Sequence, residues 1–110
     1  MATGRKQFDD FAQLYDELFT QINDYKKEVD YYHRILKQHN VKSILEIGCG
    51  TAHRSKYFID KGYDYAGLDI SKSMIELAKK HYPSTKLIVG DARNLKLRKK
   101  FDAVIFLGKG

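Results

Sequence analysis

The chain has 110 residues, of which 43% are apolar and 31% are charged, and its formal net charge is +6. This length allows one small domain with a hydrophobic core and excludes a large multidomain enzyme. The sequence has no apolar run long enough to cross a bilayer and no signal-peptide segment at its N-terminus. We therefore expect a cytoplasmic location and no membrane partner.

The cysteine, histidine and basic residues exclude further classes of site. Cys49 is the only cysteine, so an internal disulfide is impossible, and we expect it to serve as a small residue rather than as a reactive thiol. The four histidines lack the spacing of metal ligands, and no metal site is predicted. The one dense basic cluster, residues 96–100, contains no aromatic residue for base stacking. Nucleic acid is therefore the least favoured partner.

Two helices are predicted in the N-terminal part of the chain. Apolar residues recur at helical spacing between Phe8 and Phe19. Asp24 can cap a second helix, and Asn40 can end it. The residues of this second helix that we expect to face inward are Tyr25, Val29, Tyr32, Ile35 and Leu36. We predict that residues 1–40 form a helical cap across the face or mouth of the following domain.

After these helices, the hydrophobic pattern alternates between strands and helices. The predicted strands cover residues 41–48, 63–70, 85–90 and 101–107. Helices are predicted over residues 51–62 and 72–82; the first can end at Gly62, and Ser71 can cap the second. The stretch before the last strand is too short for a full crossover helix. The alternation predicts an α/β domain over residues 41–110 with a Rossmann-like parallel sheet flanked by helices.

The turn after the first strand has the residues of a nucleotide site. Gly48 and Gly50 lack a Cβ, so the backbone there can adopt positive φ and approach a ligand closely. A helix that begins near Thr51 would present free N–H groups to an anion. However, His53 replaces the third glycine of a dinucleotide fingerprint, and the acidic Glu46 precedes the turn. The pattern favours a cofactor with an ammonium or sulfonium group and disfavours a nicotinamide-dependent oxidoreductase.

Two further acidic residues end the next two strands at the same edge of the predicted sheet. Asp69 closes the second strand, where a carboxylate can accept hydrogen bonds from both hydroxyls of a ribose. The alternative role of Asp69, capping the next helix, is already served by Ser71. Asp91 follows the third strand, where it can accept from an exocyclic amine such as the adenine N6 or form an Asx turn.

The stretches ILEIGCGTA, GLDIS and VGDAR, in this order and spacing, resemble motifs I, II and III of class I S-adenosylmethionine-dependent methyltransferases. The two helices before them are similar to the N-terminal helices of small-molecule N- or O-methyltransferases. This resemblance implies S-adenosylmethionine as the cofactor, a small-molecule methyl acceptor and a sheet in the order 3-2-1-4. It also implies a cofactor site made of Tyr15, Glu46, Gly48, Cys49, Gly50, Asp69, Ile70, Met74, Asp91 and Ala92.

Within that site, the resemblance implies separate roles for the residues. Glu46 is placed near the methionine ammonium and Tyr15 near the methyl end, although Tyr15 also fits a purely structural helix face. Asp69 falls on the ribose hydroxyls and Asp91 on the adenine amine. Gly48 and Gly50 are placed beneath the methionine and ribose, and Ile70 and Met74 against the adenine. Ala92 is placed beside Asp91.

The family's sheet has seven strands in the order 3-2-1-4-5-7-6, and we expect this chain to hold only the 3-2-1-4 half. The other half normally supplies the acceptor pocket and often the general base, so no catalytic residue is assigned and activity of this chain alone stays open. The alternative function is a non-catalytic cofactor-binding or assembly module that another chain completes. The apolar strand at 101–107 would keep an unpaired edge, which predicts a homo-oligomer formed through that strand.

Overall fold

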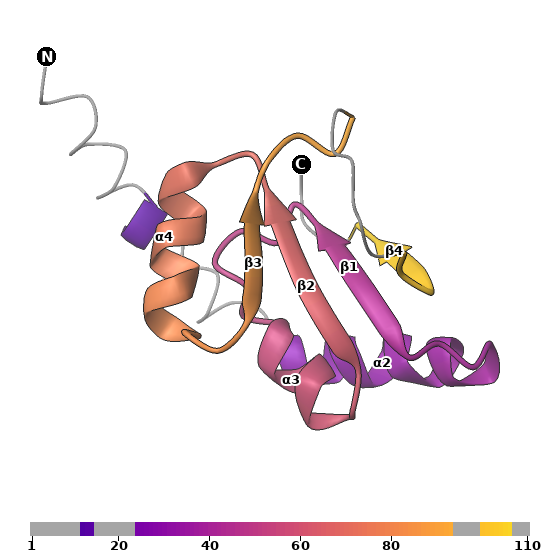
Figure 1. The fold of residues 1–110 in the computed structure, drawn as a ribbon. Helices are drawn as coiled ribbons and strands as arrows, with labels where there is room; N and C mark the ends of the chain where they lie inside the picture. The colour runs from indigo at the N-terminus through magenta and orange to yellow at the C-terminus, as the bar shows by residue number, and fades with distance from the viewer. Residues whose placement is uncertain (1–11, 15–23, 94–99, 107–110) are drawn as a thin grey trace, which may run out of the picture.

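The four strands form one parallel sheet. They are β1 (Ser43–Ile47), β2 (Asp64–Asp69), β3 (Lys86–Val89) and β4 (Ala103–Ile105). All neighbouring pairs are parallel, and the strands lie in the order β3-β2-β1-β4 (Figure 1). The α/β fold and the strand order predicted from the sequence are confirmed.

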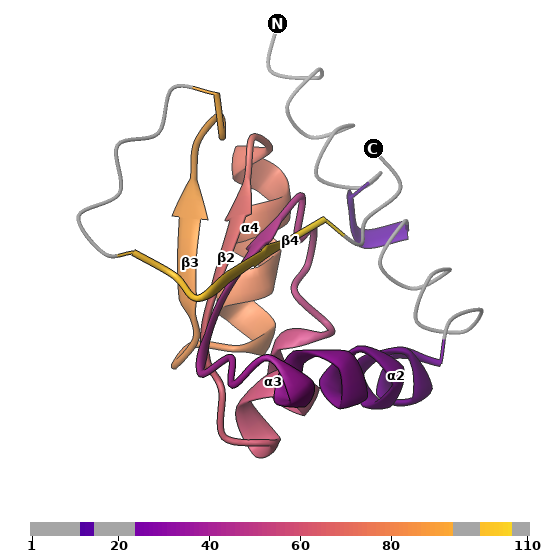
Figure 2. The same ribbon diagram turned by 90° about the vertical axis from the view of Figure 1, so that its right-hand side faces the viewer.

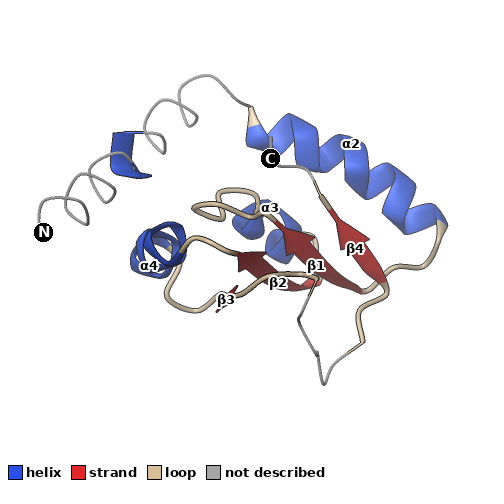
Figure 3. Ribbon diagram, turned by 90° about the horizontal axis from the view of Figure 1, so that it is seen from above, coloured by secondary structure: helices blue, strands red, loops and turns tan. Residues whose placement is uncertain are grey.

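The structure is a computed structural model that describes residues 12–14, 24–93 and 100–106. Helices α2 (Tyr25–Gln38), α3 (Ser55–Asp60) and α4 (Lys72–His81) lie on one face of the sheet (Figure 2). Seen from above, α4 lies on the β3 side, α2 on the β4 side and α3 between them (Figure 3). Residues 12–14 are helical, and the rest of the predicted first helix lies outside the described residues.

Helix α2 begins where the sequence predicts. The side chain of Asp24 accepts a hydrogen bond from the amide of Lys27 at 3.1 Å, as an N-cap should. Val29 is fully buried, but Ile35, which we predicted to face inward, is 43% exposed. That prediction was wrong because the core contacts of α2 run through Val29 and Leu36, and Ile35 lies about 100° around the helix from Leu36.

Helices α2 and α3 end in the same Schellman motif. The backbone is left-handed at Asn40, with φ +56°, and at Gly62, with φ +94°. After each helix two amides turn back to carbonyls of its last turn at 2.9–3.2 Å. These bonds run from Asn40 to Lys37, from Val41 to Leu36, from Gly62 to Ile59 and from Tyr63 to Phe58. The predicted ends of both helices are confirmed.

The start of helix α3 differs from the sequence prediction. We expected a helix from near Thr51, but α3 begins at Ser55. The backbone is left-handed at Gly50, with φ +58°, and at Ala52, with φ +63°, and a right-handed helix cannot include such residues. The first amides of α3 therefore lie several residues beyond the glycine turn, and they do not form an anion site within it.

The hydrophobic core fills both faces of the two central strands. On the helix face, Ile44 and Tyr65 pack with Val29 of α2 and Phe58 of α3. On the opposite face the buried residues are Leu45, Ala66 and Leu68. The nearly continuous apolar run of β1 is thus buried on both sides, as its sequence predicts. Because α2 contributes a fully buried side chain, it belongs to the same core as the sheet.

Cys49 packs tightly against the middle of β2. A Cβ added to Gly67 would lie 2.8 Å from the Cys49 sulfur and 3.1 Å from a methyl group of Leu87. The thiol is buried, and this burial raises its pKa well above the ordinary value. Cys49 therefore has the environment of a small packing residue, as expected from the sequence, and not that of a reactive thiol.

Replacing Gly67 with alanine is expected to lower the free energy of unfolding by about 1–3 kcal/mol, because the added methyl group overpacks this contact. The comparison is with the double variant Gly67→Ala/Cys49→Ala, in which the sulfur is absent and much of the loss should be recovered. Urea unfolding of the four variants of this cycle measures the coupling. If Gly67→Ala lowered the free energy of unfolding by the same amount in the wild type and in Cys49→Ala, the contact between Gly67 and the Cys49 sulfur would be contradicted.

Candidate functional site

The predicted site residues gather at the carboxyl edge of the sheet. The glycine turn, residues 48–50, follows β1, Asp69 ends β2, and Asp91 comes just after β3. The strands are parallel and in register, with Ile47 beside Leu68 and Asp69 beside Val89, so their ends meet at one edge (Figure 1). In open α/β sheets this edge is where ligands bind.

Asp69 joins the glycine turn to the start of α4. One of its carboxylate oxygens accepts a hydrogen bond from the amide of Gly50 at 2.8 Å, and the other accepts from the amide of Ser71 at 2.8 Å. Ser71 caps α4 through its own hydroxyl, which accepts from the amide of Met74 at 3.2 Å. Each carboxylate oxygen can accept a second hydrogen bond. Asp69 is thus held in a fixed orientation while it retains acceptor capacity for a ligand.

The backbone of the turn has the predicted left-handed conformation. Gly48 has φ +70° and Gly50 has φ +58°, values that favour glycine. The amides of Gly48 and Cys49 both donate to the carbonyl of Leu68, at 2.7 and 3.1 Å. A Cβ on Gly48 would lie 3.6 Å from the ring of Phe106, which is 60% exposed. The sequence did not identify Phe106 as a neighbour of this turn.

Glu46 is the most deeply buried charged residue of the site, with 0% exposure. Its carboxylate accepts a hydrogen bond from the Tyr65 hydroxyl at 2.6 Å and another from Arg54 Nη1 at 3.3 Å. Burial raises the pKa of Glu46 to about 7, and the Tyr65 hydrogen bond and the Arg54 charge act in the opposite direction. The carboxylate therefore faces a cation of the protein itself.

Arg54 connects this carboxylate to helix α2. Its Nε donates to Glu28 at 2.9 Å, and its guanidinium lies 5.1 Å from the centroid of the Tyr25 ring. The Arg54 side chain is 14% exposed, and its neighbours include two carboxylates and an aromatic face. The sequence pattern did not reveal this cluster, because Glu28, Glu46 and Arg54 come from three different elements. It brings α2, β1 and the segment before α3 together beneath the glycine turn.

Asp91 is held by a neighbour two residues further along the chain. The Arg93 side chain forms a bidentate pair with it, with N–O distances of 3.1 and 2.7 Å, and the Arg93 amide donates at 2.9 Å. These bonds lower the pKa of Asp91 to about 2, the Arg93 side chain being the largest cause. The Asx turn that the sequence offered as one role of Asp91 is therefore present. The adenine contact stays a prediction.

The remaining predicted residues that the structure describes lie at or near the same edge. Ile70 follows Asp69 and is 71% exposed, which is unusual for a large apolar side chain. Met74 is half-buried in the first part of α4, and Ala92 is exposed beside Asp91. Tyr15 lies outside the described residues. Thus nine of the ten predicted cofactor residues lie in or beside the three segments that follow β1, β2 and β3.

His53, which stands where a dinucleotide fingerprint has its third glycine, has a packing role. Its Nδ1 is 2.6 Å from the Tyr82 hydroxyl, and its ring stacks on Tyr25 with 5.5 Å between centroids. Among the described residues no cluster of His, Cys, Asp or Glu could hold a metal ion. None of the described helices is both long and apolar enough to span a membrane.

Comparison with known proteins identifies the family of this fold and site. A family model described as a methyltransferase domain matches residues 44–109. A curated relative from Streptomyces venezuelae, dTDP-3-amino-3,4,6-trideoxy-alpha-D-glucopyranose N,N-dimethyltransferase, is 31% identical over 99 residues. That match covers 87% of this chain and 42% of the relative.

Two solved structures have the same fold. The crystal structure of Streptomyces venezuelae DesVI matches 89% of this chain and 43% of its own, with a TM-score of 0.82 and 30% sequence identity. CalS10 is an amino pentose methyltransferase from Micromonospora echinaspora whose structure was solved with S-adenosylmethionine bound. The match covers 86% of this chain and 42% of the CalS10 chain, with a TM-score of 0.75 and 27% sequence identity. The chain therefore spans less than half the length of these proteins. The methyltransferase-domain model matches more than half of this chain, and the chain therefore belongs to the family of methyltransferase domains.

Proposed function

We propose that this chain binds S-adenosylmethionine at the carboxyl edge of its sheet and forms the cofactor-binding part of a methyltransferase that acts on a nitrogen or oxygen of a small molecule. Two findings support the proposal, namely the methyltransferase-domain match and the similarity to CalS10, which was solved with this cofactor bound. The observation that carries it is the Asp69 carboxylate, held between the glycine turn and α4 with acceptor capacity remaining. The similar proteins that act on amino sugars favour an amine nitrogen as the methyl acceptor.

The residues at this edge suit the parts of that cofactor. Asp69 can accept from the two ribose hydroxyls, one on each oxygen. The exposed side chain of Ile70 can pack against the adenine ring, and Met74, in the first part of α4, is the second candidate for this contact. The cofactor supplies a methyl group on a sulfonium, and its transfer depends mainly on the alignment of the acceptor. Glu46, which also accepts a hydrogen bond from Arg54, remains the candidate for the methionine ammonium, directly or through water.

A methyl-transfer assay tests the activity. The protein is incubated with S-adenosylmethionine labelled in its methyl group and with a panel of small amines that includes amino sugars. Label transfer to an amine supports the proposal, and label transfer to hydroxyls alone would change the acceptor to oxygen. Binding of the cofactor without transfer to any acceptor would favour the alternative, a non-catalytic cofactor-binding module completed by another chain. No catalytic residue is assigned, because no acceptor pocket is identified among the described residues.

We also propose that the protein acts in the cytoplasm and self-associates through β4. The only cysteine is a free thiol, which suits a reducing compartment. In the described sheet β4 is the last strand beyond β1. It carries the exposed apolar side chain of Val104, at 58%, and Phe106, at 60%, follows it directly. An apolar strand at the edge of a sheet favours pairing with another chain.

Sedimentation velocity tests this self-association. We expect a dimer or larger species at micromolar concentration, which Val104→Lys should shift toward the monomer because a lysine at a sheet edge opposes pairing. The matched control is Val89→Lys, which places the same charge at an exposed position on β3, the other outer strand. A monomer at all concentrations would contradict the proposal.

A further inference from the structure

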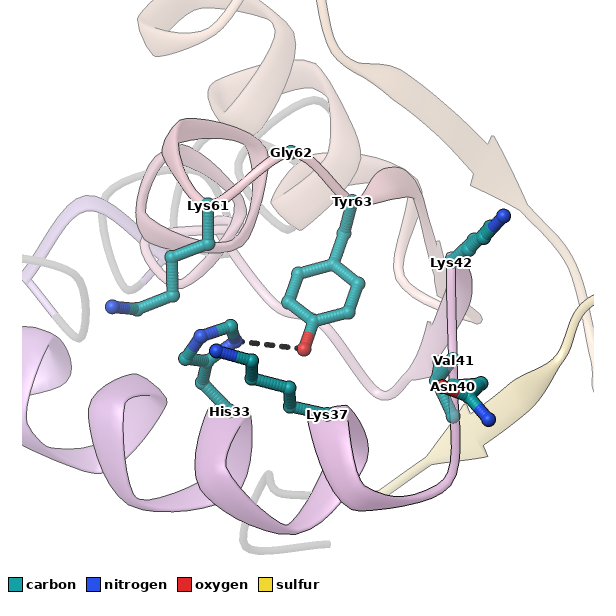
Figure 4. Close-up of a pocket in the computed structure, with 8 residues that line it drawn as sticks. All are labelled: His33, Lys37, Asn40, Val41, Lys42, Lys61, Gly62 and Tyr63. Atoms are coloured by element: carbon teal, nitrogen blue, oxygen red, sulfur yellow. Dashed lines mark hydrogen bonds between the residues drawn. The ribbon is translucent and has the colours of Figure 1, made fainter.

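A cavity of about 470 Å³ lies at the opposite edge of the sheet from the glycine turn. Figure 4 shows the residues that line it. It opens between the end of α2, the end of α3 and the residues that lead into β1 and β2. Its volume is within the range of small-molecule sites. Its lining residues 40–42 and 61–63 precede β1 and β2, so it lies at the amino ends of the strands and is separate from the candidate cofactor site.

The lining of this cavity is strongly basic. It includes His33, Lys37, Lys42 and Lys61, and none of the described residues that line it is acidic. Lys61 pairs with Asp30 at 2.6 Å, whereas Lys37 and Lys42 have no ion-pair partner in the described part of the chain. The cavity is therefore lined by three lysine ammonium groups, and the carboxylate of Asp30 neutralises only one of them. This excess of positive charge gives a potential that favours anions.

Two rings in mutual contact, those of His33 and Tyr63, line the cavity. His33 Nδ1 and the Tyr63 hydroxyl are 2.8 Å apart, and the two rings meet edge to face with 5.6 Å between centroids. Tyr63 is buried, which holds His33 in place and leaves Nε2 as the ring nitrogen that can contact a ligand. The pKa of His33 is lowered, by desolvation first and then by Lys61 and Lys37, while Asp30 acts in the opposite direction. Both lysines line the same cavity as His33.

The two helix ends offset only part of this charge. Helices α2 and α3 both finish at the cavity, where free carbonyl groups would attract cations. However, the carbonyls of Leu36, Lys37, Phe58 and Ile59 each accept a backbone hydrogen bond in the two Schellman motifs. The lysines are thus not required to satisfy those carbonyls. The Lys37 ammonium group remains available to a ligand, and a ligand would share Lys61 with Asp30.

We propose that this cavity binds a small molecule through a phosphate group, held by Lys37, Lys61 and His33. A phosphate dianion has enough charge and enough acceptor oxygens to engage three separate donors at once. Lys42 projects away from the His33–Tyr63 pair, so it adds to the potential without being a direct ligand (Figure 4). The site goes beyond the proposed methyl transfer, because it lies at the other edge of the sheet and its ligand is neither the cofactor nor the methyl acceptor.

Titration of the protein with inorganic phosphate, pyrophosphate and AMP, followed by NMR of the His33 ring and of backbone amides, tests the proposal. We expect saturable shifts at His33, Lys37 and Lys61 and a rise in the pKa of His33, because a bound anion favours the imidazolium form. Lys37→Ala should weaken phosphate binding about tenfold. Lys72→Ala, which removes an exposed lysine from the start of α4, is the matched control and should leave binding unchanged.

Each outcome of this titration decides a specific point. Tighter binding of AMP than of phosphate would identify a nucleotide as the source of the phosphate group, and equal binding would identify free phosphate; both support the site. Weak shifts spread over all surface lysines, or equal affinities in Lys37→Ala and Lys72→Ala, would overturn it. If Lys37→Ala is unfolded by circular dichroism, Lys37→Gln is measured in its place, with Lys72→Gln as its control.

Discussion

Replacing Asp69 with alanine is expected to weaken the binding of S-adenosylmethionine about a hundredfold or more, because two charge-assisted hydrogen bonds to the ribose are lost. The same change leaves the amides of Gly50 and Ser71 without their acceptor, so the turn itself becomes less defined. Isothermal titration calorimetry with S-adenosylmethionine and S-adenosylhomocysteine measures the loss. Both ligands contain the ribose, so the two affinities should fall by the same factor.

Asp64→Ala is the matched control for Asp69→Ala. Asp64 begins the strand that Asp69 ends, and its carboxylate pairs with Lys86 at 3.4 Å at the amino edge of the sheet. The control removes the same charge from the same strand, and it should leave cofactor affinity unchanged. Equal binding by the wild type and Asp69→Ala, both folded by circular dichroism, would remove Asp69 from the site.

Replacing Arg54 with methionine is expected to lower the free energy of unfolding by about 3 kcal/mol at pH 8, because Glu46 would then be buried without a cation. The loss should shrink near pH 5.5, where Glu46 is protonated and carries no charge. Denaturant unfolding at the two pH values measures the difference. Arg34→Met, at an exposed position on α2, is the control, and it should change the free energy of unfolding little at either pH. A loss that does not change with pH would contradict the account of the Glu46–Arg54 pair.

The ionisation of Glu46 also predicts how the stability of the wild type depends on pH. The pKa of Glu46 is about 7 in the folded protein, and the ordinary value of 4.5 applies in the unfolded chain. The folded state therefore binds this proton more tightly than the unfolded state. The stabilisation from this proton is complete below pH 4.5 and is lost as the pH rises through 7. Its size is about 3 kcal/mol, since one pKa unit is 1.36 kcal/mol. The difference in unfolding free energy between wild type and Glu46→Gln, followed from pH 4.5 to 8, isolates this group from the others.

Much of the fold follows from local features of the sequence. Asp24 and Ser71 cap their helices, and Asn40 and Gly62 end theirs, because the short-range hydrogen bonds and backbone conformations involved depend on few residues. The start of α3 was not predictable in this way. Ala52 adopts a left-handed conformation that its residue type does not favour, so the surrounding structure must impose it.

The candidate site was predictable in its position but not in its contacts. Strand ends and glycines place Gly48, Gly50 and Asp69 at one edge, because the carboxyl ends of parallel strands meet there. The partner of Glu46 could not be foreseen, since Arg54 reaches it only after the chain has turned back on itself. The same is true of His33 and Tyr63, which lie thirty residues apart in sequence and meet only through the packing of α2 on the sheet.

The central claim is that the carboxyl edge of the sheet is the cofactor site, and an NMR titration with S-adenosylhomocysteine tests it most directly. We expect saturable shifts of backbone amides at Gly48, Gly50, Ile70 and Ser71, with no change at Lys37 and Lys61 on the opposite edge. Shifts confined to that opposite edge, or no saturable shift in a folded protein, would contradict the assignment of the cofactor site.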